Sequence, residues 1–272
     1  MNQQELEQSV AKLPLGRVQY FETISSTNDR AIQWIEDGVP DLSLLVANEQ
    51  TAGRGRQGRR WFTPPDSALA FTLILKSGLE ESGEKNRMIT RMTGLGALAA
   101  CTAIRQTLHL PAEIKWPNDV LIGNRKVGGV LAETIWNGDV PKAVLLGIGI
   151  NITAAAVPRG IPLNYPAAAL EEYSSHPVNR LRLLTDILQE IVVWRKRLNQ
   201  PAFIDAWQRN LAYLNQQVQI VQERSDGEPR VSDGKILGLN PDGALRLAMP
   251  DGRQKSVYAG EIRIRAVDMS EK

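Results

Sequence analysis

The chain has 272 residues, of which 43% are apolar and 23% charged, so a disordered or fibrous protein is excluded and a sizeable core is expected. The net charge of +2 excludes a protein whose whole surface binds nucleic acid. A single cysteine, Cys101, excludes a disulfide framework and a cysteine metal site, and favours a reducing compartment. No apolar stretch has the length of a signal peptide core or a membrane span. We therefore expect a cytoplasmic protein without membrane contact.

The first part of the chain predicts alternating strands and helices. Residues 17–21 alternate as a strand does, and a polar cap and a short helix that ends at Gly38 follow them. Apolar runs at 42–48 and 67–76 predict two buried strands. The basic stretch between them, residues 50–60, has no apolar periodicity and predicts a loop.

A long helix at 86–109 carries many small residues on one face, which predicts close packing against a sheet. Three strand-like runs follow, and the dipeptides Gly123-Asn124 and Asn137-Gly138 that separate them predict antiparallel hairpins. Helices are predicted at 179–198 and 201–214.

Five short β runs fill the rest of the chain and predict a small barrel. We therefore expect a catalytic-sized α+β domain at 1–214 and a small β domain at 215–272.

The segment Gln50–Trp61 contains four arginines, and no acid occurs before Pro65. Its glycines fit the spacing of a dinucleotide-binding turn, but Trp61 and the following Phe-Thr-Pro-Pro cannot open the helix which that motif requires. An RNA-binding arginine-glycine stretch and a solvated loop remain alternatives. We favour an anion-binding loop, because several guanidinium groups can hold a carboxylate and a phosphate side by side. Such a loop is expected to be mobile without ligand, since its arginines have little to bind until anions arrive.

Three later segments carry lone polar residues or glycines in adjacent predicted strands. They are Lys115–Asp119, Arg125–Glu133 and Gly147–Asn151. Paired glycines inside an apolar strand indicate that a ligand approaches the backbone, and a lysine beside them offers an anion partner. The segments together predict one side of a pocket, and sheet twist with tight helix packing is the alternative.

These segments resemble the motifs of biotin protein ligases, and the likeness covers roughly residues 17–268. The matching motifs, in chain order, are Ser26-Thr27-Asn28, the arginine loop Gly53–Trp61, Lys115–Asp119, Arg125–Glu133, Gly147–Asn151 and the C-terminal signature at Tyr258–Ile262. The resemblance implies an α+β catalytic domain of the class II synthetase type, with a mixed, largely antiparallel sheet and packed helices, followed by an SH3-like β-barrel.

The resemblance also implies ATP-dependent biotinylation of a specific lysine on a biotin carboxyl carrier protein, through bound biotinyl-5′-AMP and with Mg²⁺. No enzyme-bound acyl intermediate is needed. The sequence agrees, because Cys101 lies in an apolar helix and neither His109 nor His176 is paired with a nucleophile. Catalysis would rest on positioning and charge neutralisation.

The resemblance implies roles for individual residues. In the biotin pocket, Ser26 and Thr27 would bind the ureido group, and Asn28 of the same motif would belong to the substrate-binding residues. Gln50 and Gly53 would line the cavity. At the phosphate end, Arg54 and Arg56 would lie over the carboxylate or phosphate, and Trp61 would anchor the loop or cover the ligand. Lys115 would bind the α-phosphate, and Lys126 would meet the acyl-phosphate junction. Gly128, Gly129 and Gly147 would allow close backbone approach. Asp119 would place Mg²⁺ or orient Lys115, and Asn151 would contact phosphate or metal. Helix capping is the equal alternative for Ser26 and Thr27.

The sequence departs from the family at three points. Gln57 stands where some members are basic, and Tyr165 is the one aromatic candidate for the adenine-covering role of a tryptophan in some relatives. About 16 residues precede the first strand, too few for the DNA-binding domain of regulatory members, so no specific DNA binding is expected. A lipoate or octanoate ligase and a non-catalytic RNA-binding protein are the alternative functions, and both a monomer and a homodimer remain open.

Overall fold

A computed structural model describes residues 1–76, 85–160, 163, 165–222, 230–258 and 262–266. Its larger sheet has seven strands in the order β1-β2-β3-β7-β6-β5-β4, and β1 and β2 are its parallel pair. The strands are β1 (Val18–Ile24), β2 (Ser43–Gln50), β3 (Ala68–Leu75), β4 (Glu113–Lys115), β5 (Asp119–Ile122), β6 (Arg125–Asn137) and β7 (Val140–Asn151). The mixed, largely antiparallel α+β fold and the antiparallel hairpins predicted from the sequence are confirmed.

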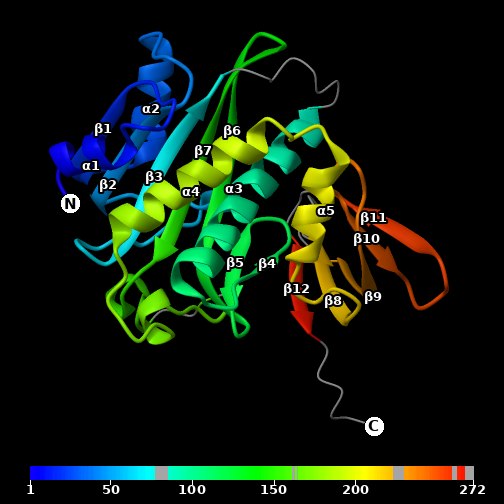
Figure 1. Ribbon diagram of the computed structural model, residues 1–272. Coiled ribbons are helices and arrows are strands. Elements are labelled where there is room, and N and C mark those ends of the chain that lie inside the picture. The colour runs from blue at the N-terminus through cyan, green and yellow to red at the C-terminus, as the bar shows by residue number, and fades with distance from the viewer. Residues whose placement is uncertain (77–84, 161–162, 164, 223–229, 259–261, 267–272) are drawn as a thin grey trace.

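Helices cover both faces of this sheet (Figure 1). They are α1 (Gln3–Val10), α2 (Thr27–Glu36), α3 (Lys85–Leu108), α4 (Arg180–Arg195) and α5 (Pro201–Arg209). Side chains alternate along β2, so Leu44 and Val46 join the core under α3 and α4, while Leu45 joins a smaller core under α2. The sheet therefore has an α3 face and an α2 face.

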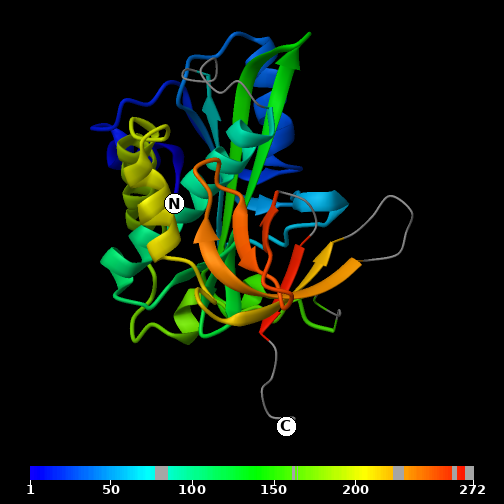
Figure 2. The ribbon, with the colours of Figure 1, turned by 90° about the vertical axis from the view of Figure 1, so that its right-hand side faces the viewer.

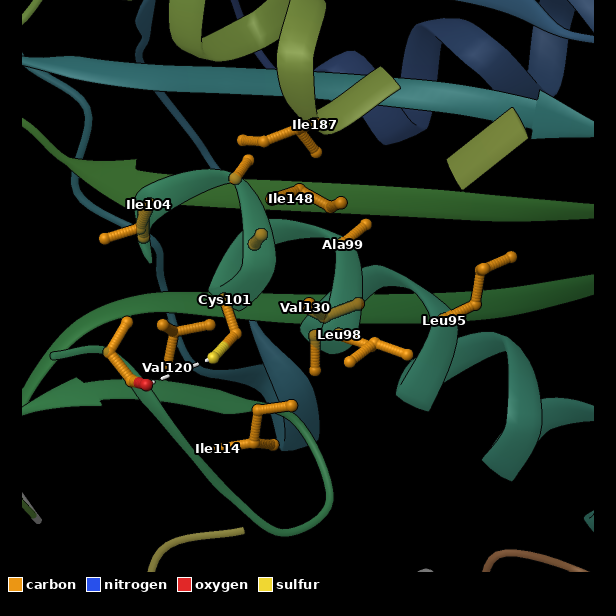
Figure 3. Close-up of a cluster of buried hydrophobic side chains, with 14 of the residues drawn as sticks. Leu95, Leu98, Ala99, Cys101, Ile104, Ile114, Val120, Val130, Ile148 and Ile187 are labelled. Atoms are coloured by element: carbon orange, nitrogen blue, oxygen red, sulfur yellow. Dashed lines mark hydrogen bonds between the residues drawn. The ribbon is translucent and has the colours of Figure 1, made fainter. Parts of the chain in front are cut away.

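Helix α3 packs closely on the sheet, as its small residues predict. A Cβ added to Gly96 would lie 2.8 Å from Val130 Cγ1, so the helix backbone almost touches the strand side chains. Figure 3 shows α3 residues such as Leu98 and Cys101 between Ile114 on one side and Ile148 on the other. This packing holds β4 to β7 against one long rigid helix.

Two helices differ from the sequence prediction. Helix α1 was not predicted, although Asn2 and Glu5 form a capping box at its start and Leu6 is fully buried. Helix α5 ends at Arg209 and not at residue 214, because residues 210–212 pair with β4. The Ile114 N–H donates to Asn210 O at 2.7 Å, and this pairing replaces the last helical turn.

The C-terminal strands form a second, antiparallel sheet in the order β11-β10-β9-β8-β12 (Figure 2). They are β8 (Gln217–Gln222), β9 (Arg230–Leu239), β10 (Leu245–Ala248), β11 (Gln254–Val257) and β12 (Ile262–Ala266). Trp116 Nε1 donates to Gly243 O at 2.9 Å and joins the turn after β4 to this sheet. Residues 259–261 of the predicted C-terminal signature lie outside the described residues. No helix in the described part of the chain is long and apolar enough to cross a membrane.

Candidate active site

A pocket lies on the α2 face of the large sheet, where glycines leave the strand backbone uncovered by side chains. Gly147 and Gly149 of β7 share this face with Leu145, and Gly129 of β6 is paired with Gly149. The residues that line the pocket are Ser26, Thr27, Asn28, Gln50, Arg54, Gly55, Arg56, Trp61, Phe71, Asn118, Lys126, Gly129, Val130, Leu131, Gly147, Ile148 and Gly149. The structure thus gathers most of the predicted site residues around one cavity.

The Trp61 indole lies against these glycines. A Cβ on Gly149 would come within 2.3 Å of Trp61 Cε2, and one on Gly129 within 3.3 Å of Trp61 Cζ3. The indole therefore requires a glycine at position 149, whereas a side chain at position 129 would make a tight contact with it. Trp61 Nε1 is buried without a hydrogen-bond partner among the described residues, so this wall of the pocket holds an unused donor.

Three polar residues meet at the start of α2. Ser26 is the N-cap, and its Oγ accepts from the Asp29 N–H at 3.4 Å. Gln50 Oε1 accepts from the Thr27 N–H at 2.9 Å, and Gln50 Nε2 donates to Thr63 Oγ1 at 3.2 Å. Helix capping by Ser26 is confirmed, and it leaves both hydroxyl residues on the pocket wall.

The arginine loop is fastened to the body of the protein by its own charges. Arg54 bridges Asp29 at 2.7 Å and Glu133 at 2.5 Å, and Arg56 Nη1 donates to Asn118 Oδ1 at 2.9 Å. The expectation that the arginines find little to bind before anions arrive is therefore wrong for these two residues. Arg54 is turned toward carboxylates, whereas Arg56 reaches the turn between β4 and β5.

Asp119 organises the cations at the other end of the pocket. Lys126 Nζ lies 2.6 Å and Lys115 Nζ 3.6 Å from its carboxylate oxygens. Burial alone would raise the pKa of Asp119, but the charges of Lys126 and Lys115 outweigh it and hold that pKa below its ordinary value. Burial lowers the pKa of Lys115, and Asp119 opposes the change. Two ammonium groups are thereby held close together beside the cavity.

Tyr165 covers the buried lysine of this cluster. Its ring centroid lies 3.8 Å from Lys115 Nζ, and its hydroxyl is 2.5 Å from the hydroxyl of Tyr213. Burial raises the pKa of Tyr165, and the Tyr213 hydroxyl adds to the shift, so both phenols stay neutral at physiological pH. Tyr165 therefore stacks on a cation in this structure.

Besides Lys115 and Asp119 of the cation cluster, three predicted residues do not line the cavity. Gly53 O accepts from the Trp61 N–H within the loop, and a Cβ there would lie 2.4 Å from Trp61 O. Gly128 faces the α3 side of the sheet, where a Cβ would lie 2.5 Å from Ile150 Cδ1. Asn151 Nδ2 donates to Ala168 O at 3.0 Å and holds the loop after β7. Each of the three serves local packing.

The residues present do not fit a metal ion held by the protein. Both Asp119 oxygens face lysines, and the Asn151 amide is turned to a carbonyl oxygen. Within the described ranges no group of three or more His, Cys, Asp or Glu side chains could hold a metal. Asp119 and Asn151 are therefore engaged by protein partners and do not form a metal site.

The structure also brings in residues that the sequence did not predict. Asn118 Oδ1 accepts a hydrogen bond from Arg56 Nη1, and the Thr72 hydroxyl of β3 contacts the side chains of both Thr27 and Asn28. Thr72 had a signal, because it is the one polar residue in the run Ala68–Leu75. Cys101 is buried, and burial raises its pKa to about 12, which excludes a thiolate nucleophile as predicted.

Comparisons with known proteins cover both sheets of the chain. Residues 20–151 match the Biotin/lipoate A/B protein ligase family, and residues 213–265 match the Biotin protein ligase C terminal domain. The biotin–[acetyl-CoA-carboxylase] ligase of Paracoccus denitrificans is 31% identical over 84% of this chain and 93% of its own length. The bifunctional ligase/repressor BirA of Bacillus subtilis is 28% identical over 90% of this chain and 73% of its own length.

A solved structure shares the fold. The biotin protein ligase of Aquifex aeolicus in complex with biotin and ATP matches with a TM-score of 0.75 and 26% identity, over 92% of this chain and 99% of that one. The two family-model matches cover the pocket and the three charged residues Lys115, Asp119 and Lys126 (residues 20–151) and nearly all of the C-terminal sheet (residues 213–265). The chain therefore belongs to the biotin/lipoate A/B protein ligase family, as an enzyme of its biotin protein ligase branch.

Proposed function

We propose that this enzyme condenses biotin with ATP to give bound biotinyl-5′-AMP, and then transfers the biotinyl group to one lysine of a biotin carboxyl carrier protein. One observation carries the proposal. A pocket with hydroxyl and amide groups at one end adjoins a cluster of buried cations at the other, as a ligand with a polar ring and a distant carboxylate requires.

The biotin ring fits the end formed by α2 and the glycine strands. A ureido group offers two N–H donors and one carbonyl acceptor, and Ser26, Thr27 and Gln50 supply complementary groups on the wall. The indole of Trp61 supplies apolar surface beside them. This arrangement leaves the valeryl chain to run toward Lys126.

The cations then neutralise the charges that meet there. A biotin carboxylate oxygen attacks the α-phosphorus, the bond to the β-phosphate breaks, and pyrophosphate leaves. Lys115 and Lys126 stabilise the charge on the α-phosphate, and Arg56 closes over the junction. The carrier lysine amine, in its neutral form, next attacks the biotinyl carbonyl. An amide forms, AMP leaves, and the amine proton passes to solvent.

The proposal also covers the roles of the two parts of the chain and the cellular compartment of the enzyme. We assign the catalytic site to residues 1–214 and a supporting role to residues 215–272, because each of the residues named above lies in the first part. The buried reduced thiol of Cys101 fits the cytoplasm, where a carrier protein of a biotin-dependent carboxylase would be met.

The test is transfer to a purified carrier domain in its unmodified form. With biotin and ATP, mass spectrometry should show one biotinyl group on one lysine, and pyrophosphate release should depend on biotin. Replacement of that lysine by arginine should abolish transfer and leave pyrophosphate exchange intact. Transfer of lipoate in preference to biotin would overturn the proposal in favour of a lipoate ligase, and RNA-dependent activity without biotin would overturn it altogether.

Asp119→Asn is expected to move the alkaline limit of adenylation to lower pH. Burial already lowers the pKa of Lys115, and the Asp119 charge is the largest influence that raises it. Without that charge the pKa falls further, so the charged ammonium is lost at a lower pH as alkali is added. The measurement is biotin-dependent pyrophosphate exchange between about pH 7 and pH 10. An alkaline limb at the same pH in both proteins would contradict it.

A further inference from the structure

A chain of hydrogen bonds leads from the arginine loop to the wall of the biotin pocket. It begins at Arg54, which is paired with Glu133 Oε1, and Glu133 Oε2 accepts from Asn28 Nδ2 at 2.7 Å. Asn28 Oδ1 accepts from the Thr72 hydroxyl at 2.5 Å. The oxygens of Thr72 and Thr27 are 2.8 Å apart, and Thr27 lies on the pocket wall. Thr72 itself is fully buried behind that wall.

The chemistry of the chain allows one direction of donation. A carboxylate only accepts hydrogen bonds, so the Asn28 amide must turn its NH₂ to Glu133 and its oxygen to Thr72. Thr72 has a single hydroxyl hydrogen, and Asn28 Oδ1 takes it. Thr72 Oγ1 is then an acceptor toward Thr27. The Thr27 hydrogen consequently points to Thr72 or to Gln50 Oε1 at 3.1 Å, and both acceptors belong to the protein.

The result is a hydroxyl with fixed polarity. Thr27 Oγ1 presents lone pairs to the cavity, whereas Ser26, whose oxygen accepts from the Asp29 N–H, is suited to donate its own hydrogen. One acceptor next to one donor matches an N–H and the C=O of a cyclic urea. Gly147 makes room for the arrangement, because a Cβ there would lie 2.5 Å from Asn28 Oδ1.

We infer that Thr72, held in orientation by Asn28 and Glu133, is a positioning residue that makes Thr27 an acceptor for a ureido N–H. This inference rests on the proposed binding of biotin in this pocket. Thr72 touches no ligand and acts through Thr27, so its effect falls on the recognition of the ring and not on the phosphate chemistry.

The central test compares Thr72→Val, which keeps the shape and removes the hydroxyl, with Thr72→Ser, which restores it. Thr72→Val should raise the Kd of biotin about 3- to 10-fold, since one orienting hydrogen bond is lost and Asn28 Oδ1 loses its donor. The KM of ATP should not change, and Thr72→Ser should bind biotin with the affinity of the wild-type enzyme. The control is Thr93→Val, because Thr93 is also a buried threonine, 8% exposed, but donates to Ile89 O inside α3.

A second measurement separates polarity from general damage. The probes are the two cyclic carbamate analogues of biotin, each with one ureido N–H replaced by oxygen. In the unmodified protein the analogue with oxygen opposite Thr27 places two acceptors face to face and binds weakly. In Thr72→Val the Thr27 hydrogen is held less firmly and can turn to the analogue, so the preference for biotin over it should shrink about 3- to 10-fold.

Each outcome has a separate meaning. Equal biotin affinities in Thr72→Val and Thr93→Val, or an unchanged ratio between biotin and both carbamates, would overturn the role of Thr72 while leaving the proposed function standing. Failure of Thr72→Ser to restore binding would assign the loss to packing and would also overturn it. If calorimetry shows that the unmodified enzyme does not bind biotin, the proposed function fails, and the inference falls with it.

Discussion

Lys115→Ala should lower biotin-dependent pyrophosphate exchange by about 10²- to 10³-fold, the loss typical of one preorganised donor. Lys115 as a residue is 8% exposed, and its ammonium lies near both the Asp119 carboxylate and the Tyr165 ring, so it is held in place before ATP arrives. Its removal also leaves Asp119 with Lys126 as its remaining lysine partner, which makes the site less positive where the α-phosphate charge develops. Biotin binding by itself should change little, because Lys115 does not line the pocket.

The control for this change is Lys142→Ala, which removes an exposed lysine from β7 in the same sheet. It should leave exchange and thermal unfolding as they are. Lys115→Ala should also keep a cooperative unfolding transition, since the methylene chain it removes is small relative to the surrounding core. A folded Lys115→Ala protein with an unchanged exchange rate would remove Lys115 from the phosphate site.

The sequence predicts the strands of the large sheet because their signals are local. Period-two alternation, buried apolar runs and Asn-Gly type dipeptides each act within a few residues, and their pattern decides pairing directly. Helix α5 shows the limit of such signals. Residues 210–214 continue a helical pattern. Residues 210–212 instead form backbone hydrogen bonds with Ile114 of β4, which is distant in sequence, and the helix therefore ends before them.

In the candidate site, too, local patterns predict some features, and contacts between distant segments decide others. Motif spacing identifies which segments meet, and the pocket confirms that Ser26, Gln50 and Lys126 lie together. It does not identify what each side chain faces. Alternation alone places Gly128 and Gly129 on opposite sides of β6, so just one of the pair can face the pocket. The pairing of Arg54 with Glu133 depends on the fold of the loop, which no local pattern encodes.

Arg56→Gly should release biotinyl-5′-AMP into solution and so acylate lysines of unrelated proteins. Arg56 links the loop to the turn after β4 through its hydrogen bond to Asn118 Oδ1 at 2.9 Å. Its loss removes a charge-assisted hydrogen bond and adds a flexible residue, so escape of the intermediate should rise about tenfold to a hundredfold. Adenylation should fall less than in Lys115→Ala, because Lys115 and Lys126 remain beside the α-phosphate.

Two measurements decide whether the loop acts as a lid. Amide exchange of residues 50–65 should be slower with biotinyl-5′-AMP than without it in the unmodified enzyme, because the ligand adds an apolar surface and a phosphate to the contacts that already fasten Arg54 and Arg56. Biotin incorporation into albumin should then be much faster with Arg56→Gly than with Arg60→Gly, which introduces the same flexibility into the loop but keeps the bond to Asn118. If the two variants label albumin equally, or if biotinyl-5′-AMP leaves the amide exchange of residues 50–65 unchanged, closure of the loop does not retain the intermediate. The arginines then act through their charge alone, and the water-sensitive mixed anhydride must be protected by the pocket wall around Trp61.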